Sequence, residues 1–281
     1  AIRIGREIVS HWNKAPKHKE PVTHPADPFY DPDELYGIIP DDIKRQFDMR
    51  EIIARLVDES DFHEYQPDYG KTMICGYSRL WGYEVGILAN NGVLFNDSTL
   101  KSAHFIELCN QNETPLIFLQ NITGFMVGKD YEANGITKDG AKMLMAQVGS
   151  HVPKFTIMCA GSFGAGNYGM CGRAYDSRFL YSWPNHQIGI MGGEQAAKTL
   201  VEVKERQLKK RDSVVDAKVL DQVYTETLKA YQHQMSAYYA TSQLWDDGIL
   251  DPIDTRSALG MSISAAMNAP FVNQGYGVFR L

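Results

Sequence analysis

The sequence has few cysteines and no cysteine-based motif. Its four cysteines form neither a Cys-x-x-Cys pair nor a cysteine–histidine pattern with the spacing of metal ligands. The sequence therefore offers no metal site. Most of these residues lie in apolar or helical stretches, which is typical of small buried thiols in a reducing compartment. They are Cys75, Cys109, Cys159 and Cys171.

Long apolar runs and an excess of positive charge are also missing. No apolar run reaches the length of a membrane-spanning helix, so we expect no membrane contact. The net charge of −6 argues against a nucleic-acid-binding surface. No signal peptide opens the chain. The 281 residues, of ordinary apolar content, are enough for one large domain or two small ones.

The first thirty residues differ from the rest. Apolar residues in the segment 1–12 recur at the spacing of one helix face, yet no capping residue precedes them. Either the chain continues a helix of a longer protein, or a native helix has a frayed start. Residues 14–33 are rich in proline, which predicts an extended linker without a helix.

Beyond the linker, apolar patterns alternate between the strand period and the helix period. Strands that alternate with helices predict a largely parallel sheet covered by helices, an α/β fold. Ser98 is the expected N-cap of the second helix. Residues 204–213 are charged and expected to be exposed. The predicted strands are 71–80, 83–89, 115–120, 154–160, 179–183 and 187–191, and the predicted helices are 41–58, 98–110, 137–152, from 194, 214–235 and 254–267.

The stretch from Gly161 to Gly172 is the most informative part of the sequence. Glycines at 161, 164 and 166 follow an apolar strand and open a short helical segment. Glycine allows a tight turn and close approach of a ligand to the backbone. The free N–H groups at such a junction can bind an anion or a developing oxyanion. A tight turn without a ligand is the alternative interpretation.

Two further strand-to-helix junctions carry glycine pairs. The loop 120–128 contains Gly124 and Gly128 with Asn121 and Thr123, and the segment 191–197 begins with Gly192 and Gly193. Each alone is an ordinary loop. Together with the 161–172 stretch they place free amides along one edge of the predicted sheet, where α/β proteins bind ligands.

Several catalytic motifs are absent. The sequence contains no Gly-x-Ser-x-Gly nucleophile elbow and no phosphate-binding loop of the Walker type. Tyr168 and Tyr175 lie close to the glycine-rich stretch, but packing is their expected role. The histidines at 104, 151 and 186 are scattered and expected to be structural. Many backbone donors without an evident base suggest a stabilised enolate, with the proton handled by substrate or cofactor.

At these segments the chain resembles the carboxyltransferase β subunits of biotin-dependent acyl-CoA carboxylases. The resemblance covers nearly the whole chain and is closest to the branch that acts on 3-methylcrotonyl-CoA. It is carried by the segments 90–95, 118–128, 139–143, 161–175, 179–185, 191–197, 245–256 and 276–280.

The resemblance implies a crotonase-like β-β-α superhelix. It implies that residues 1–30 are a linker helix and proline-rich linker from a missing N-terminal domain, and that 31–281 are the C-terminal domain. In this family that domain mainly holds carboxybiotin. The resemblance assigns the backbone amides of Ala165 and Gly166 to the oxyanion hole for the biotin ureido oxygen. It places further biotin-pocket residues at Gly124, Phe125, Phe163, Gly164, Gly192 and Gly193.

The implied activity is an enzymatic one: carboxyl transfer from carboxybiotin to 3-methylcrotonyl-CoA in leucine degradation. The implied partners are the acyl-CoA, a biotin-carrying α subunit, the chain's own N-terminal domain, and further copies as dimers stacked into hexamers. The implied compartment is intracellular: cytoplasmic in a bacterium, the mitochondrial matrix in a eukaryote.

Three alternatives remain open. The first is a geranyl-CoA carboxylase β subunit, which shares these motifs. The second is a biotin-independent hydratase or isomerase of the crotonase type, which requires a carboxylate at the pocket. The third is a non-catalytic assembly module. Because half of each active site is missing, we expect the isolated chain to be inactive.

Overall fold

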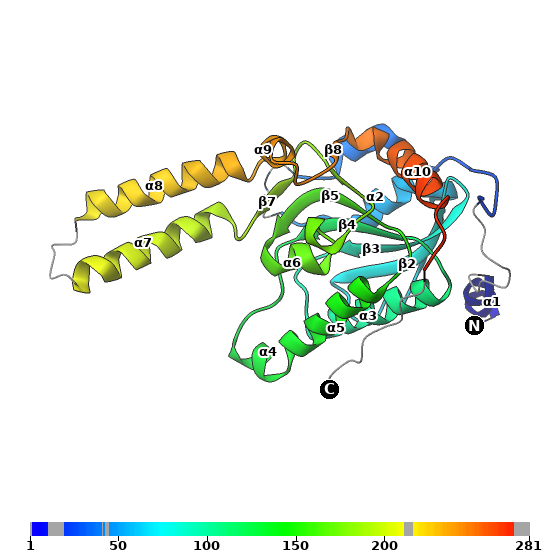
Figure 1. Cartoon of the computed structure of the whole chain (residues 1–281), viewed down its shortest axis with the longest axis horizontal. Helices are drawn as coiled ribbons and strands as arrows, with labels where there is room; N and C mark the ends of the chain where they lie inside the picture. The colour runs from blue at the N-terminus through cyan, green and yellow to red at the C-terminus, as the bar shows by residue number, and fades with distance from the viewer. Residues whose placement is uncertain (1, 11–19, 41, 43–44, 211–215, 273–281) are drawn as a thin grey trace.

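A single mixed sheet forms the centre of the protein (Figure 1). The computed structural model describes residues 2–10, 20–40, 42, 45–210 and 216–272. In these residues the strand order is β1-β2-β3-β4-β5-β6-β8, with β7 also paired to β5. The strands are β1 Phe62–Glu64, β2 Met73–Leu80, β3 Tyr83–Asn90, β4 Leu116–Ile122, β5 Lys154–Phe163, β6 Phe179–Ser182, β7 Gln187–Gly189 and β8 Gly248–Ile249.

The sheet is antiparallel at one end and parallel elsewhere. β1, β2 and β3 pair antiparallel, whereas β3, β4, β5 and β6 pair parallel in turn, as do β5 with β7 and β6 with β8. The predicted hairpin 71–89 and the parallel core are therefore confirmed. All ten residues of β5 are buried, which is expected for a parallel strand covered on both faces. The short edge strands β1 and β8 were not predicted.

Helices cover both faces of the sheet (Figure 1). α3 and α5 lie on one face, and α2 and α10 lie on the other. The helices are α1 Ile2–Ser10, α2 Met49–Leu56, α3 Asn96–Gln111, α4 Lys129–Ala133, α5 Ile136–Gly149, α6 Gly164–Gly169, α7 Gly193–Lys210, α8 Ala217–Gln234, α9 Ala237–Ser242 and α10 Thr255–Ala266. Short 3₁₀ turns occupy η1 Pro32–Gly37, η2 Asp58–Ser60, η3 Arg173–Tyr175 and η4 Pro252–Asp254.

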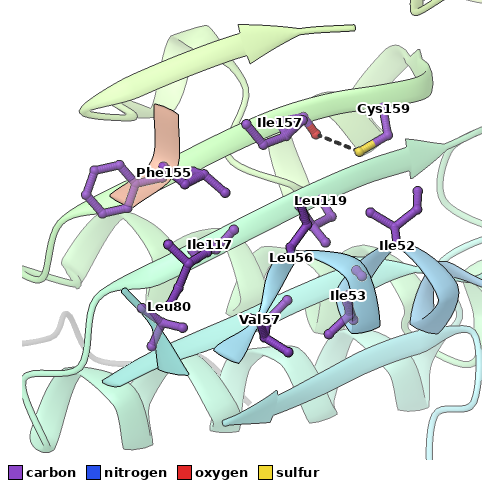
Figure 2. Packing of buried hydrophobic residues seen from close by; sticks show 14 of the residues in the cluster. Ile52, Ile53, Leu56, Val57, Leu80, Ile117, Leu119, Phe155, Ile157 and Cys159 are labelled. Atoms are coloured by element: carbon purple, nitrogen blue, oxygen red, sulfur yellow. Dashed lines mark hydrogen bonds between the residues drawn. The ribbon is translucent and has the colours of Figure 1, made fainter. Parts of the chain in front are cut away.

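The apolar face of α2 packs on the sheet and forms part of the core. Apolar residues of α2 and its C-cap face strands β2, β4 and β5, and all are at most 2% exposed (Figure 2). Burial of a side chain of this size contributes about 1.5–3 kcal/mol. The contacting residues are Ile52, Ile53, Leu56 and Val57 on one side, and Leu80, Ile117, Leu119, Phe155, Ile157 and Cys159 on the other.

Burial also keeps the four cysteine thiols protonated. All four are free and buried, as the sequence predicts for structural thiols. Desolvation raises the pKa of every one of them, to about 12 for Cys75 and Cys171. The thiolate form is therefore suppressed, and none of the four has the lowered pKa of a reactive cysteine.

Two helix starts differ from the prediction. The helix expected at 41–58 is α2, which begins at Met49 because the Asp48 side chain caps it by accepting from Arg50 N–H; residues 41, 43 and 44 lie outside the described residues. The N-cap expected at Ser98 is wrong. α3 begins at Asn96, and the Ser98 hydroxyl accepts from the backbone N–H of Phe95, 2.7 Å away, from within the first turn.

The pair α7 and α8 forms an arm that projects from the body (Figure 1). Only Ala196 and Ala197 of α7 are buried, and no residue of α8 is. The charged stretch expected at 204–213 is the helical end of α7 as far as Lys210, supported there by a Glu205–Lys209 ion pair at i,i+4. Residues 211–215 fall outside the described part of the chain.

No helix among the described residues is both long and apolar enough to cross a lipid bilayer.

A buried ion pair joins the linker segment to the body. Asp58, 6% exposed in its side chain, accepts from the N–H groups of Trp81 and Gly82 at the β2–β3 turn and pairs with Arg256 at 2.8 Å. Arg256 also donates to the carbonyls of Leu56 and Ala26. One guanidinium therefore connects the linker, α2, the hairpin and α10.

Replacing Arg256 with Met should destabilise the chain by about 3–5 kcal/mol, because it leaves a buried carboxylate without its cation. Urea unfolding followed by circular dichroism measures the loss. Arg206→Met is the matched control, since Arg206 makes an exposed ion pair with Glu202 that is worth under about 1 kcal/mol. Equal midpoints for the two variants would contradict the assignment.

Candidate functional site

A large open cleft lies at the carboxyl ends of the parallel strands. Its volume is about 1490 Å³. It is lined by the loops that follow β3, β4, β5, β6 and β7, by residues before α2, and by α7 and α8. The carboxyl edge of a parallel sheet is where α/β proteins bind ligands, so this cleft is the candidate site.

The cleft brings the three glycine-rich junctions together. They come from the β4–α4 loop, the β5–α6 turn and the β7–α7 turn, which are far apart in the sequence. Of the eight predicted site residues, seven line the cleft: Gly124, Phe125, Phe163, Gly164, Ala165, Gly192 and Gly193. The eighth, Gly166, is buried beneath it.

The β5–α6 turn requires glycine at 164. Its φ of +54° lies in the left-handed region, and a Cβ there would stand 3.0 Å from the carbonyl oxygen of Ile190. Ala165, the next residue, is exposed to the cleft. Residues 164–166 form the first turn of α6, where backbone N–H groups have no acceptor within the helix.

Gly166 has a different steric role. A Cβ on this residue would lie 2.5 Å from Cγ1 of Ile122 and 3.0 Å from Cα of Gly124. The absence of a side chain therefore lets α6 lie directly on the loop that follows β4. Any larger residue would push the helix away from that loop.

Phe125 lies at the cleft but its ring packs inward. A Cβ at Gly140 of α5 would stand 2.9 Å from the ring, and a Cβ at Gly169 of α6 would stand 3.2 Å from it. The ring therefore fills a slot between α5 and α6. A backbone bridge between Leu94 and Phe125 holds the loop in this place.

The two glycines before α7 are not equivalent. A Cβ on Gly192 would meet nothing within 4 Å, so this position faces open space. A Cβ on Gly193 would lie 3.2 Å from Cβ of Tyr231 in α8. Gly193 thus permits the close approach of α7 and α8 at the base of the arm, as well as lining the cleft.

Sequence reasoning missed several polar residues of the cleft. Arg45, Asn185 and Lys198 line it, but a single charged or amide residue in a loop or on an exposed helix face gives no pattern to recognise. The carboxylates that line it, Asp42, Glu194 and Glu202, are all exposed.

His186, for which the sequence analysis expects a structural role, is buried in the cleft wall. Its side chain is 1% exposed, and Nδ1 lies 3.1 Å from the carbonyl oxygen of Ala160. Burial lowers the pKa of His186 to about 4, so the imidazole is neutral at neutral pH. Tyr168 and Tyr175, also expected to pack, contact each other with ring centroids 5.5 Å apart.

The described residues assemble no group of three or more His, Cys, Asp or Glu side chains that could hold a metal ion.

Comparison with curated proteins gives matches over the whole of this chain. It is 50% identical over all its residues to the mitochondrial methylcrotonoyl-CoA carboxylase beta chains of Dictyostelium discoideum and Arabidopsis thaliana. It is 47% identical to the biotin-dependent 3-methylcrotonyl-coenzyme A carboxylase beta1 subunit of Mycobacterium tuberculosis. The matches cover 48%, 49% and 53% of those proteins, so the chain spans about half their length.

Solved structures agree with the fold. The beta subunit of P. aeruginosa geranyl-CoA carboxylase matches 99% of this chain with 53% of its own length, at 41% identity and a TM-score of 0.81. The transcarboxylase 12S structure, which is described as a hexamer assembly, matches 99% with 53% of its own length, at 28% identity and a TM-score of 0.86. These matches confirm the crotonase-like α/β fold expected from the sequence.

Residues 1–276 match the family of carboxyl transferase domains. Together with the relatives that are about half identical over the whole chain, this match settles the family. The chain is a member of the carboxyl transferase domain family.

Proposed function

We propose that this chain is the biotin-side half of a carboxyltransferase that transfers a carboxyl group from carboxybiotin to 3-methylcrotonyl-CoA in leucine degradation. The observation that carries the proposal is the convergence of three glycine-rich junctions on one cleft. It occurs in a chain that is 50% identical to methylcrotonoyl-CoA carboxylase beta chains. Residues 31–281 then form the C-terminal domain, and residues 1–30 connect it to an N-terminal domain.

The residues of the cleft fit a cyclic urea. Such a ring offers a carbonyl oxygen to hydrogen-bond donors and two flat apolar faces. Ala165 is exposed at the cleft, and its backbone N–H belongs to the first turn of α6, where no acceptor lies within the helix. Val127 and Ile190, each 77% exposed at the cleft, supply apolar surface. When bound, carboxybiotin supplies the activated carboxyl group.

In this proposal the chain's own residues orient the ring and stabilise negative charge. The Ala165 N–H donates to the ureido oxygen. The Gly166 N–H is the second donor that the family resemblance assigns, and its missing side chain keeps α6 seated on the β4 loop. One preorganised backbone donor at a developing oxyanion contributes about 3–4 kcal/mol to lowering the barrier. The carboxylates of the cleft are exposed, which fits catalysis by backbone donors better than catalysis by a buried general base.

The proposed partners follow from the missing half. The N-terminal domain binds the acyl-CoA and supplies the second half of each active site. Biotin is carried in by a separate subunit. Further copies of the chain assemble as dimers within a hexamer, in line with the hexamer assembly of the transcarboxylase 12S relative. The proposed compartment is the cytoplasm of a bacterium or, as for the mitochondrial relatives, the mitochondrial matrix.

Geranyl-CoA is the second candidate substrate, because the P. aeruginosa geranyl-CoA carboxylase beta subunit is 41% identical to this chain. The test compares kcat/KM for 3-methylcrotonyl-CoA and geranyl-CoA in the complete enzyme. A higher kcat/KM for geranyl-CoA would overturn the substrate assignment and leave the reaction class unchanged.

Replacing Ala165 with Pro in the complete enzyme should lower kcat about 10²- to 10³-fold, because proline has no N–H to donate. Ala165→Ser is the control, since serine keeps the N–H at this exposed position. Circular dichroism and melting temperature verify that both variants fold. If the proline variant turns over within threefold of the serine variant, the donor role of Ala165 is wrong.

The 281-residue chain alone should transfer no carboxyl group, because it supplies one side of the proposed site. The assay follows carboxylation of 3-methylcrotonyl-CoA with free carboxybiotin, and the full-length subunit under the same conditions is the positive control. Turnover by the chain alone above the uncatalysed rate would refute the division into two half-sites.

A further inference from the structure

The helix that carries Ala165 is too short to be stable by itself. α6 has six residues, below the length at which an isolated helix persists in water. The last carbonyl groups of any helix also have no N–H donor within the helix and must be satisfied from elsewhere. The position of the Ala165 N–H therefore depends on whatever holds α6 from outside.

Buried side chains from three elements bind the carbonyls at the end of α6 and just after it. Gln147 of α5 donates from Nε2 to the Tyr168 carbonyl at 3.0 Å, and Gln120 of β4 donates from Nε2 to the Met170 carbonyl at 2.8 Å. Thr156 of β5 donates from Oγ1 to the Cys171 carbonyl at 2.7 Å. All three donors are 0% exposed.

A second chain of hydrogen bonds holds the middle of α6. Asn167 donates from Nδ2 to Oγ of Ser162 at 2.7 Å, and that hydroxyl donates to Oε1 of Gln120 at 2.6 Å. Because its Oε1 is engaged by Ser162, the Gln120 amide must direct its Nε2 to the Met170 carbonyl. Ser162 is also 0% exposed.

The surrounding backbone is shaped for this network. The β4–β5 register shifts between Gln120 and Ile122, which displaces Ser162 relative to β4 at the point where the network crosses the two strands. Gly172 is required next to Asn167, because a Cβ there would stand 1.9 Å from the Asn167 Oδ1. Neither Gln120, Ser162 nor Asn167 is among the described residues that line the cleft.

We propose that Gln120, Ser162 and Asn167 are positioning residues for the transfer reaction: they hold α6, and thereby the Ala165 N–H, at the geometry that the developing oxyanion requires. They act through the helix and touch no substrate. This inference rests on the proposed function of Ala165, but the hydrogen-bonded network that it uses is independent of any ligand.

Ser162→Ala in the complete enzyme is the decisive variant, because it breaks both links of the chain and removes one oxygen atom. We expect kcat to fall about 10- to 100-fold, the range for a catalytic group that is misplaced by about 1 Å. KM for the acyl-CoA should stay within twofold, since the other half-site holds most of that substrate. Asn167→Ala, at a half-buried position, breaks the first link alone and should lower kcat in the same direction.

Ser182→Ala is the matched control. Ser182 is also 0% exposed, lies at the end of the neighbouring parallel strand β6, and donates to Oδ2 of Asp246, a residue outside α6, at 2.6 Å. It should lower the melting temperature about as much as Ser162→Ala but leave kcat within twofold. If Ser162→Ala and Asn167→Ala also keep kcat within twofold, the positioning role is refuted.

Amide hydrogen exchange of the 281-residue chain gives a readout that needs no activity. Ser162→Ala should speed exchange in the segment 164–171 by at least about tenfold and leave the segment 154–158 of β5 unchanged. Unchanged exchange in 164–171 would overturn the proposal. If the complete wild-type enzyme transfers no carboxyl group, but Ser162→Ala still speeds exchange in 164–171, the proposed function is refuted and the network is retained.

Discussion

The parallel pairing of β4 with β5 is the constraint on which the rest of the structure depends. It runs from Leu116↔Lys154 to Gln120↔Met158, and β5 is buried along its whole length. Both strands end at the same edge, so the loop after β4 and the turn after β5 meet there. The register shifts beyond Gln120, where Ile122 pairs with Ser162, and the buried amide of Gln120 donates from this region to the carbonyl of Met170. The cleft lies at the edge where these two strands end.

At this edge the residues that shape the backbone are also residues of the proposed site. Gly164 adopts a left-handed φ at the turn from β5 into α6, directly before Ala165, whose N–H is the proposed donor. Gly166 lies against Cα of Gly124 because Gly166 has no side chain, which brings two glycine-rich segments into contact. A ligand site formed by backbone groups requires this kind of support, since no side chain can compensate for a displaced helix.

The sequence predicted the features that depend on local pattern. Continuous apolar runs such as 115–120 and 154–160 indicated buried parallel strands, and the glycine pairs marked the three junctions that the structure brings to one cleft. Features set by contacts between distant segments were missed or misplaced. Ser98 caps α3 from inside the helix because its hydroxyl reaches back to Phe95, and the Phe125 ring packs against Gly140 and Gly169, which no spacing rule reveals. Gln120 looks like an ordinary polar residue at a strand end until Ser162 and Met170 are seen beside it.

The arm of α7 and α8 lines the cleft on one side and faces solvent on the others. On its inner side, Leu228 and Gln232 of α8 and Lys198 of α7 form a wall of the cleft. On its other sides the arm is almost entirely solvent-facing, with Leu200 and Val219 uncovered. A subunit that settles on the outside of this arm therefore presses on the same helices that bound the ligand space. If a subunit contact formed on the outside of the arm, that contact and the width of the cleft entrance would depend on the same pair of helices.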